Sequence, residues 1–182
     1  MKEKQRTILF DINKILNKIN ISNRQKVADL GCGNFGFFVF PLAKLVGKDG
    51  QVFAVDILKS ALNEIESQAK SLNFSQVKTI WSDLEIFRAT KIETASLDAV
   101  IFINTLNQIN KKRIALQEAS RLVKTGGKIL IIDWKNNTPL GPALEKRVDV
   151  KEVEEVCSHL GLNISEEFEA GPYHYGLILK KL

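Results

Sequence analysis

The chain has 182 residues, of which 45% are hydrophobic and 26% are charged, a balance typical of one soluble domain with a buried core. Its apolar runs fall short of the ~20 residues that a membrane-spanning helix needs, and the charged start does not match a signal peptide. Two cysteines, Cys32 and Cys157, are too few for a disulfide framework or a zinc site, so we expect a cytoplasmic protein without a membrane partner.

The net charge of +5 is concentrated near the N-terminus, where residues 1–26 carry seven Lys or Arg and two acids. Such a basic arm could meet RNA or another anionic partner. The solvated face of one amphipathic helix explains the same charges, and Phe10 is the only aromatic residue among them. We favour the helix, and nucleic acid stays open as an alternative partner.

Hydrophobic periodicity predicts that amphipathic helix over residues 4–19. Beyond it, short apolar runs alternate with helical patterns, which is typical of a parallel α/β sheet. The predicted order is strand 27–31, helix 37–47, strand 51–56, helix 58–72, strand 77–81, a short connection over 83–96, strand 98–103, helix 111–123 ended by Gly126-Gly127, and strand 128–134.

The C-terminal part departs from this alternation. A polar, proline-bearing loop over 135–148 leads to a predicted helix over 149–160. Two last strands, 163–170 and 174–181, are joined by Gly171-Pro172. A Gly-Pro pair between two strand patterns predicts a tight turn, and therefore an antiparallel hairpin.

A glycine-rich loop follows the first predicted strand. The second half of the run Val27–Gly36 contains three glycines, Gly31, Gly33 and Gly36. Gly33 has no Cβ that would stand between the backbone and a ligand. A helix opening at about Phe37 would point free N–H groups into the same space. Asp56, twenty residues after Gly36, ends the next strand and suits the two hydroxyls of a ribose. The pattern predicts a nucleoside-containing cofactor.

The three glycines and the distant acid also match the dinucleotide fingerprint, so they do not identify the cofactor alone. Asp29 precedes the first glycine by two residues. A carboxylate there would repel a pyrophosphate and would attract an ammonium or a sulfonium. The acid therefore favours a cofactor with a cationic end.

The segment Asp29-Leu30-Gly31-Cys32-Gly33 resembles motif I of the class I S-adenosylmethionine-dependent methyltransferases. Ser82-Asp83 resembles the adenine-contact motif of this family, Leu97–Val100 the opening of motif IV, and Glu118–Gly127 the helix and turn before strand five. The resemblance covers residues 24–182. A nicotinamide-binding domain would need a sixth parallel strand and a substrate domain, for which the length leaves no room.

The resemblance implies an α/β, Rossmann-like class I methyltransferase fold. We therefore expect a mostly parallel seven-stranded sheet with a C-terminal antiparallel hairpin and helices on both faces. It implies a single domain over 1–182, with an N-terminal helix over 1–20 and a cofactor-binding core over 24–182. Whether residues 1–20 form a lid over the site is left open, and so is the oligomeric state.

The resemblance also implies S-adenosyl-L-methionine as the cofactor, bound beyond the carboxyl ends of the strands. The methionine part would lie against Asp29 and the backbone of the glycine loop, the ribose against Asp56, and the adenine between Ile57, Asp83 and the N–H of Leu84. Asp56 could instead cap the following helix, and Ser82-Asp83 could merely start a turn. The expected cofactor-binding residues are Asp29, Gly31, Cys32, Gly33, Asp56, Ile57, Asp83, Leu84 and Asn104.

Catalysis by such an enzyme consists mainly of positioning, which can supply ~7–11 kcal/mol. A general base is needed only where the acceptor must lose a proton. The candidate catalytic residues near the strand ends, whether as a base or in positioning the acceptor, are Asn104, Asp133, Trp134 and His174, although aromatic residues around His174 could simply begin a half-buried strand. The loop over 135–148 starts where Asp133 and Trp134 end their strand, so we expect it to act as a lid.

The pattern is closest to small-molecule methyltransferases of ubiquinone and menaquinone biosynthesis. The Asn/Asp-Pro-Pro-Tyr/Phe motif of amino-methylating enzymes is absent, because the fourth strand ends in Asn104-Thr105-Leu106. We expect no bound metal, although carboxylates alone could hold magnesium. We predict methyl transfer to a small molecule. An RNA or protein methyltransferase, or a cofactor-binding scaffold without activity, remains the alternative.

Overall fold

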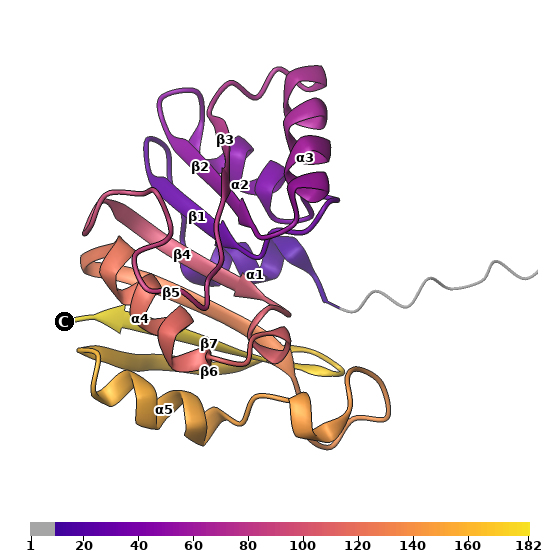
Figure 1. The fold of residues 1–182 in the computed structure, drawn as a ribbon, viewed down its shortest axis with the longest axis vertical. Coiled ribbons are helices and arrows are strands. Elements are labelled where there is room, and N and C mark those ends of the chain that lie inside the picture. Colours follow the sequence, from indigo (N-terminus) through magenta and orange to yellow (C-terminus); the bar gives the residue numbers. More distant parts are fainter. Residues whose placement is uncertain (1–9) are drawn as a thin grey trace, which may run out of the picture.

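In the computed structural model, which describes residues 10–182, seven strands form one sheet in the order β3-β2-β1-β4-β5-β7-β6 (Figure 1). Strands β1 to β5 run parallel, and β7 lies antiparallel between β5 and β6. This confirms the predicted sheet and its C-terminal hairpin. The strands are β1 Lys26–Leu30, β2 Gln51–Asp56, β3 Val77–Trp81, β4 Leu97–Ile103, β5 Val123–Trp134, β6 Leu162–Gly171 and β7 His174–Lys181.

Helices cover both faces of this sheet, as predicted (Figure 1). Two apolar clusters separate them, because successive residues of a strand point to opposite faces. Val100 and Phe102 of β4 pack with α4 and α5, whereas Ala99 and Ile101 pack with α1, α2 and α3. The helices are α1 Ile12–Ile19, α2 Val39–Val46, α3 Lys59–Ser71, α4 Lys112–Leu122 and α5 Val150–Ser158, with short 3-10 turns η1 Leu106–Gln108 and η2 Leu144–Lys146.

The N-terminal helix α1 is part of the core on one face. Its Ile15, Leu16 and Ile19 are 1–2% exposed and pack with α2 and the sheet. Asp11 caps the helix by accepting the N–H of Lys14 at 3.2 Å. The helix predicted over residues 4–19 therefore begins at Ile12, because Phe10 and Asp11 are not helical, and residues 4–9 lie outside the described residues. Within the described part, no helix is long and apolar enough to cross a bilayer.

Two further predicted boundaries are wrong. Helix α2 begins at Val39, two residues later than predicted, which leaves Pro41 among the first four residues, where an N–H has no intrahelical acceptor. Helix α4 ends at Leu122, and the chain enters β5 at once at Val123. Gly126-Gly127 therefore do not end a helix but lie where the pairing of β5 with β4 shifts its register. Pairing with β4 decided this boundary, not local turn chemistry.

Candidate functional site

A cavity of about 330 Å³ opens at the carboxyl edge of the sheet, beyond the ends of β1, β2, β3 and β4. It brings together six of the nine predicted cofactor-binding residues, and Asp29, Cys32 and Asn104 are not among its walls. Larger hollows of about 780 and 670 Å³ contain none of the nine, and one of about 410 Å³ contains only Gly33. The cavity is lined by Gly31, Gly33, Asp56, Ile57, Leu58, Ser82, Asp83, Leu84, Glu85, Thr105, Gln108 and Ile109.

The glycine loop can take its course only because two of its residues lack a side chain. Gly31 has φ 84°, and a Cβ there would overlap the side chain of Thr105. Gly33 has φ 62°, and the place of its Cβ is open space beside the cavity. Positive φ values of this kind favour glycine. The backbone of the loop therefore forms one wall of the cavity directly.

Asp56 ties the end of β2 to this loop. Its Oδ2 accepts the N–H of Gly33 at 2.9 Å, and its Oδ1 accepts the N–H of Leu58, the N-cap residue of α3, at 2.9 Å. The carboxylate is 8% exposed at the cavity wall. A carboxylate has about four lone-pair sites, so two acceptor positions remain for a ligand. Asp56 therefore closes a turn before α3 and also forms part of the cavity wall.

Asp29 is a buried carboxylate with an oxygen that is unpaired in the described part of the chain. It is 3% exposed, and its Oδ1 accepts no hydrogen bond from any residue between 10 and 182. Burial, with a smaller contribution from the nearby charge of Asp56, raises the pKa of Asp29 to about 7. An unpaired buried anion is costly, so the site suits a cationic group. Asp29 therefore fits the ammonium or sulfonium of S-adenosylmethionine.

Cys32 and Asn104 border the same edge. Burial, followed by the charges of Asp29 and Asp56, raises the pKa of the Cys32 thiol, so the sulfur stays protonated. Asn104 directly follows β4 with φ 53°, and its buried Oδ1 has no partner in the described chain. A positive φ outside glycine together with an unpaired buried oxygen is typical of a functional position.

Asp133 lies in the interior rather than at the cavity. It is 0% exposed and accepts the backbone and side-chain N–H groups of Asn107 at 3.1 and 3.0 Å and the N–H of Trp134 at 2.8 Å. Burial raises the pKa of Asp133 to about 6, although these hydrogen bonds oppose the shift. A general base must reach the proton that it takes. The geometry instead gives Asp133 the role of fixing η1 to the end of β5.

Trp134 and His174 form an aromatic cluster beside the end of β5. The ring centroid of His174 lies 4.1 Å from that of Trp134 and 5.1 Å from that of Phe10. His174 is 0% exposed, and neither ring nitrogen has a hydrogen-bond partner among the described residues. Burial lowers the pKa of His174 to about 4, with a smaller effect of Lys135, so the imidazole is neutral. Neither Trp134 nor His174 lines the cavity, although β5, which Trp134 ends, pairs with β4.

The predicted lid, residues 135–148, is held in one shape by Arg147. The guanidinium donates to five backbone carbonyls at 2.7–3.1 Å, those of Lys135, Asn136, Thr138, Leu140 and Pro142. At Gly141, with φ 106°, a Cβ would collide with the ring of Trp134. The loop is therefore a preformed wall against Trp134. No sequence pattern identified Arg147, because one arginine in a polar loop has no distinctive spacing.

Sequence reasoning missed four of the twelve residues that line the cavity: Leu58, Glu85, Gln108 and Ile109. Leu58 and Glu85 directly follow predicted residues and could have been found from that adjacency. Gln108 and Ile109 come from η1 and its exit, which no periodic pattern marks. Among the described residues, no group of three or more His, Cys, Asp or Glu side chains could hold a metal ion.

Comparison with known proteins agrees with this geometry. A family model described as a methyltransferase domain matches residues 21–172. The solved structure of a SAM-dependent methyltransferase from Aquifex aeolicus is 25% identical, with a TM-score of 0.86 over 96% of this chain and 91% of that one. A putative type 11 methyltransferase from Sulfolobus solfataricus is 30% identical, with a TM-score of 0.77 over 95% and 93%.

Curated relatives are more distant. A demethylmenaquinone methyltransferase from a Geobacillus strain is 25% identical over 69% of this chain and 52% of its own length. An arsenite methyltransferase from Aquipseudomonas alcaligenes is 30% identical over 59% of this chain and 32% of its own length. The chain thus spans about half or less of the length of these relatives. The family match covers most of the chain, and the resemblance read from the glycine loop is confirmed: this chain belongs to the methyltransferase domain family.

Proposed function

We propose that this chain transfers a methyl group from S-adenosyl-L-methionine to a small-molecule acceptor. The observation that carries the proposal is Asp29, a buried carboxylate with an unpaired oxygen beside a glycine loop. Such a group would repel the pyrophosphate of a dinucleotide and attract an ammonium or sulfonium. The names of the solved and curated relatives support the same cofactor and reaction class.

The cavity walls, together with Asp29, Cys32 and Asn104 beside them, support an assignment of each part of the cofactor to particular residues. Asp29, with the backbone of Gly31, Cys32 and Gly33, would hold the methionine end, and the free acceptor positions of Asp56 would take the ribose hydroxyls. The adenine would lie between Ile57, Asp83 and Leu84, and Asn104 would border the methyl group. When bound, the cofactor supplies a methyl group on a sulfonium, which is a good leaving group. The chain itself would bind the cofactor and the acceptor, orient them and exclude water.

The acceptor would lie over the ends of β4 and β5. Thr105, just after β4, lines the cavity, and Trp134 ends β5, the next strand. Neighbouring strands are ~4.8 Å apart, so an acceptor against Trp134 would be within reach of the cofactor. The loop held by Arg147 would form the outer wall. Holding acceptor and methyl carbon at near-attack distance can supply ~7–11 kcal/mol, without a base at the site.

The residues favour an organic acceptor over arsenite. Soft metal-like centres select thiolates, but Cys32 lies in the glycine loop and Cys157 is buried in α5. Burial raises the pKa of both thiols, so neither is a thiolate at neutral pH.

Two unpaired cysteines also suit a reducing compartment, which supports a cytoplasmic location.

A transfer assay with radiolabelled cofactor tests the proposal. The full chain would be incubated with demethylmenaquinol, a panel of hydroxylated aromatic compounds, arsenite, short RNA and a protein extract. We expect label in an organic small molecule, and less of it with the Asp56→Ala variant at a cofactor concentration below saturation. Label in RNA or protein would support the alternative acceptors suggested by the basic N-terminus. Cofactor binding without any transfer would indicate a scaffold.

A further inference from the structure

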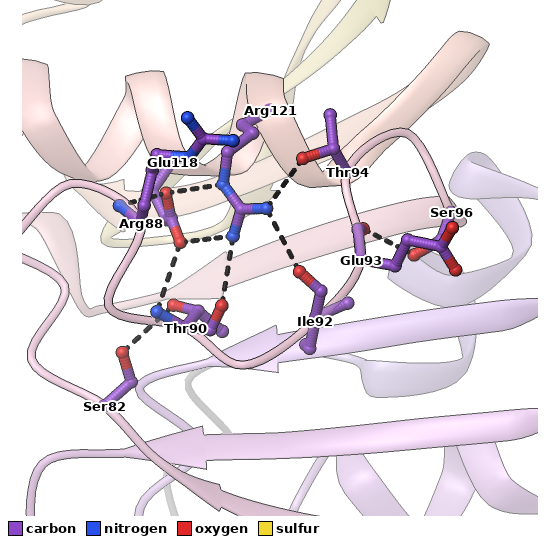
Figure 2. A network of polar contacts seen from close by, with 9 residues as sticks. All are labelled: Ser82, Arg88, Thr90, Ile92, Glu93, Thr94, Ser96, Glu118 and Arg121. Carbon is purple, nitrogen blue, oxygen red and sulfur yellow. Dashed lines mark hydrogen bonds and ion pairs between the residues drawn. The ribbon is translucent and has the colours of Figure 1, made fainter.

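A buried ion pair on α4 holds the connection between β3 and β4. Figure 2 shows Arg121 against Glu118, with Nη2 and Nε donating to the two carboxylate oxygens at 2.7 and 3.0 Å. The Glu118 side chain is 0% exposed and that of Arg121 is 10% exposed. Hydrogen bonds from Arg121 and from the backbone keep the pKa of Glu118 below its usual range, although burial opposes this. Glu118 is therefore an anion in the interior.

Residues 82–96 form neither helix nor strand, and the ion pair supplies hydrogen-bond partners for their backbone. Glu118 accepts the N–H groups of Arg88 and Thr90 at 2.9 and 3.3 Å. Arg121 donates to the carbonyls of Thr90 and Ile92 at 3.1 and 3.0 Å and to the hydroxyl of Thr94 at 3.0 Å (Figure 2). Buried backbone groups need such partners, because an unpaired one is costly.

One hydrogen bond connects this network to the cavity. The hydroxyls of Thr90 and Ser82 lie 3.0 Å apart, and both residues are at most 2% exposed (Figure 2). Ser82 lines the cavity, together with Asp83, Leu84 and Glu85. A continuous set of contacts therefore runs from Arg121 through Thr90 to the residues proposed to meet adenine.

We infer that Glu118 and Arg121 are positioning residues that set the selectivity of the site for adenine. They fix the backbone at Thr90, which fixes Ser82 and with it the place of Asp83 and Leu84. A buried ion pair by itself is weak evidence for stability, since an apolar pair of the same volume often stabilises as well. Its value here lies in the five hydrogen bonds by which Glu118 and Arg121 hold an irregular segment in one conformation. The inference rests on the proposed placement of the cofactor in this cavity.

Calorimetry with two ligands tests the inference about Glu118 and Arg121. The ligands are S-adenosylhomocysteine and the analogue in which hypoxanthine replaces adenine. Wild type should bind the adenine ligand more tightly. Thr90→Val cuts the link to Ser82 while leaving the ion pair intact, and Arg121→Lys keeps the charge but loses the planar fork. Each variant should reduce the preference for adenine about fivefold, the equivalent of one hydrogen bond. Arg113→Lys, at an exposed position on the same helix, should keep it.

The outcomes separate the two proposals. If wild type prefers adenine and both variants keep that preference while only their melting temperatures fall, the ion pair is merely structural and the inference is overturned. If wild type binds S-adenosylhomocysteine without any preference for adenine, or does not bind it, the placement of the cofactor fails and the inference falls with it. Thr90→Val leaves the ion pair in place, so the test does not depend on whether Arg121→Lys folds.

Discussion

The carboxylate of Asp56 accepts the backbone N–H of Gly33 at 2.9 Å, so the end of β2 holds the glycine loop that follows β1. The two residues are 23 positions apart in sequence and line the same cavity. One carboxylate thereby shapes the loop and presents free lone pairs to a ligand. A substitution at Asp56 should disturb both.

Asp56→Ala should weaken binding of S-adenosylhomocysteine at least tenfold, because each hydrogen bond to a charged group is worth about 1.5–3 kcal/mol. The fold should persist, since the core lies elsewhere. Asp49→Ala, an exposed aspartate in the turn before β2, is the matched control and should leave affinity unchanged. Equal affinities of Asp56→Ala and wild type in calorimetry would leave Asp56 with only a structural role, in the turn before α3.

Cofactor binding should depend on pH through Asp29. Because burial raises its folded pKa from 3.8 to about 7, ionisation of Asp29 destabilises the ligand-free protein as pH rises through this window. A cationic ligand stabilises the ionised form, so binding should release protons at pH 6.5 and tighten towards pH 8. Calorimetry in buffers of different ionisation enthalpy measures this release. Asp29→Asn should abolish it, and an unchanged proton release in that variant would assign it to another group.

His174 should affect the pH dependence of folding stability with the opposite sign to Asp29. Its folded pKa is lowered to about 4, so the unfolded chain binds the proton first, and stability falls as pH drops from 6.5 to about 4. His174→Phe keeps an aromatic ring between Phe10 and Trp134 and should flatten this acid limb. Urea denaturation from pH 4 to 8 compares the variant with wild type. Parallel curves would mean that His174 is not the group that titrates.

Trp134→Ala should lower turnover by roughly ten- to a hundredfold, the scale of a misplaced acceptor, with cofactor affinity nearly intact. The reason is its position at the end of β5, outside the cavity that fits the cofactor. Steady-state kinetics with the acceptor found by the transfer assay, together with calorimetry, separate the two effects. A large loss of cofactor affinity with unchanged turnover at saturation would contradict the placement of the acceptor.

Arg147→Lys should loosen the loop over 135–148, because an ammonium cannot reach five carbonyls at once. We expect the KM of the acceptor to rise about fivefold or more, with the cofactor dissociation constant unchanged. Hydrogen exchange of the loop amides should accelerate. Lys146→Ala changes a neighbouring exposed residue and serves as the control. Slow exchange in Arg147→Lys would show that other contacts hold the loop.

The sequence by itself determined the order of the elements and the position of the glycine loop. Periods of two and of 3.6 residues are local properties, so strands such as β2 and helices such as α3 could be predicted nearly to their ends. The three glycines and Asp56 were also readable, because backbone geometry after a strand and the meeting of strand ends at one edge follow from local rules. That information was sufficient to predict the family.

Only the tertiary structure decided which polar residues reach the ligand space. Asp133 and His174 stand at strand ends, as predicted, yet both are fully buried and take part in packing. The contacts of Glu118 with Arg88 and Thr90 join positions 30 and 28 residues apart. Pairing with β4 makes β5 begin at Val123, five residues before its predicted start. Burial and hydrogen-bond partners depend on residues distant in the chain. A local pattern contains no information on them.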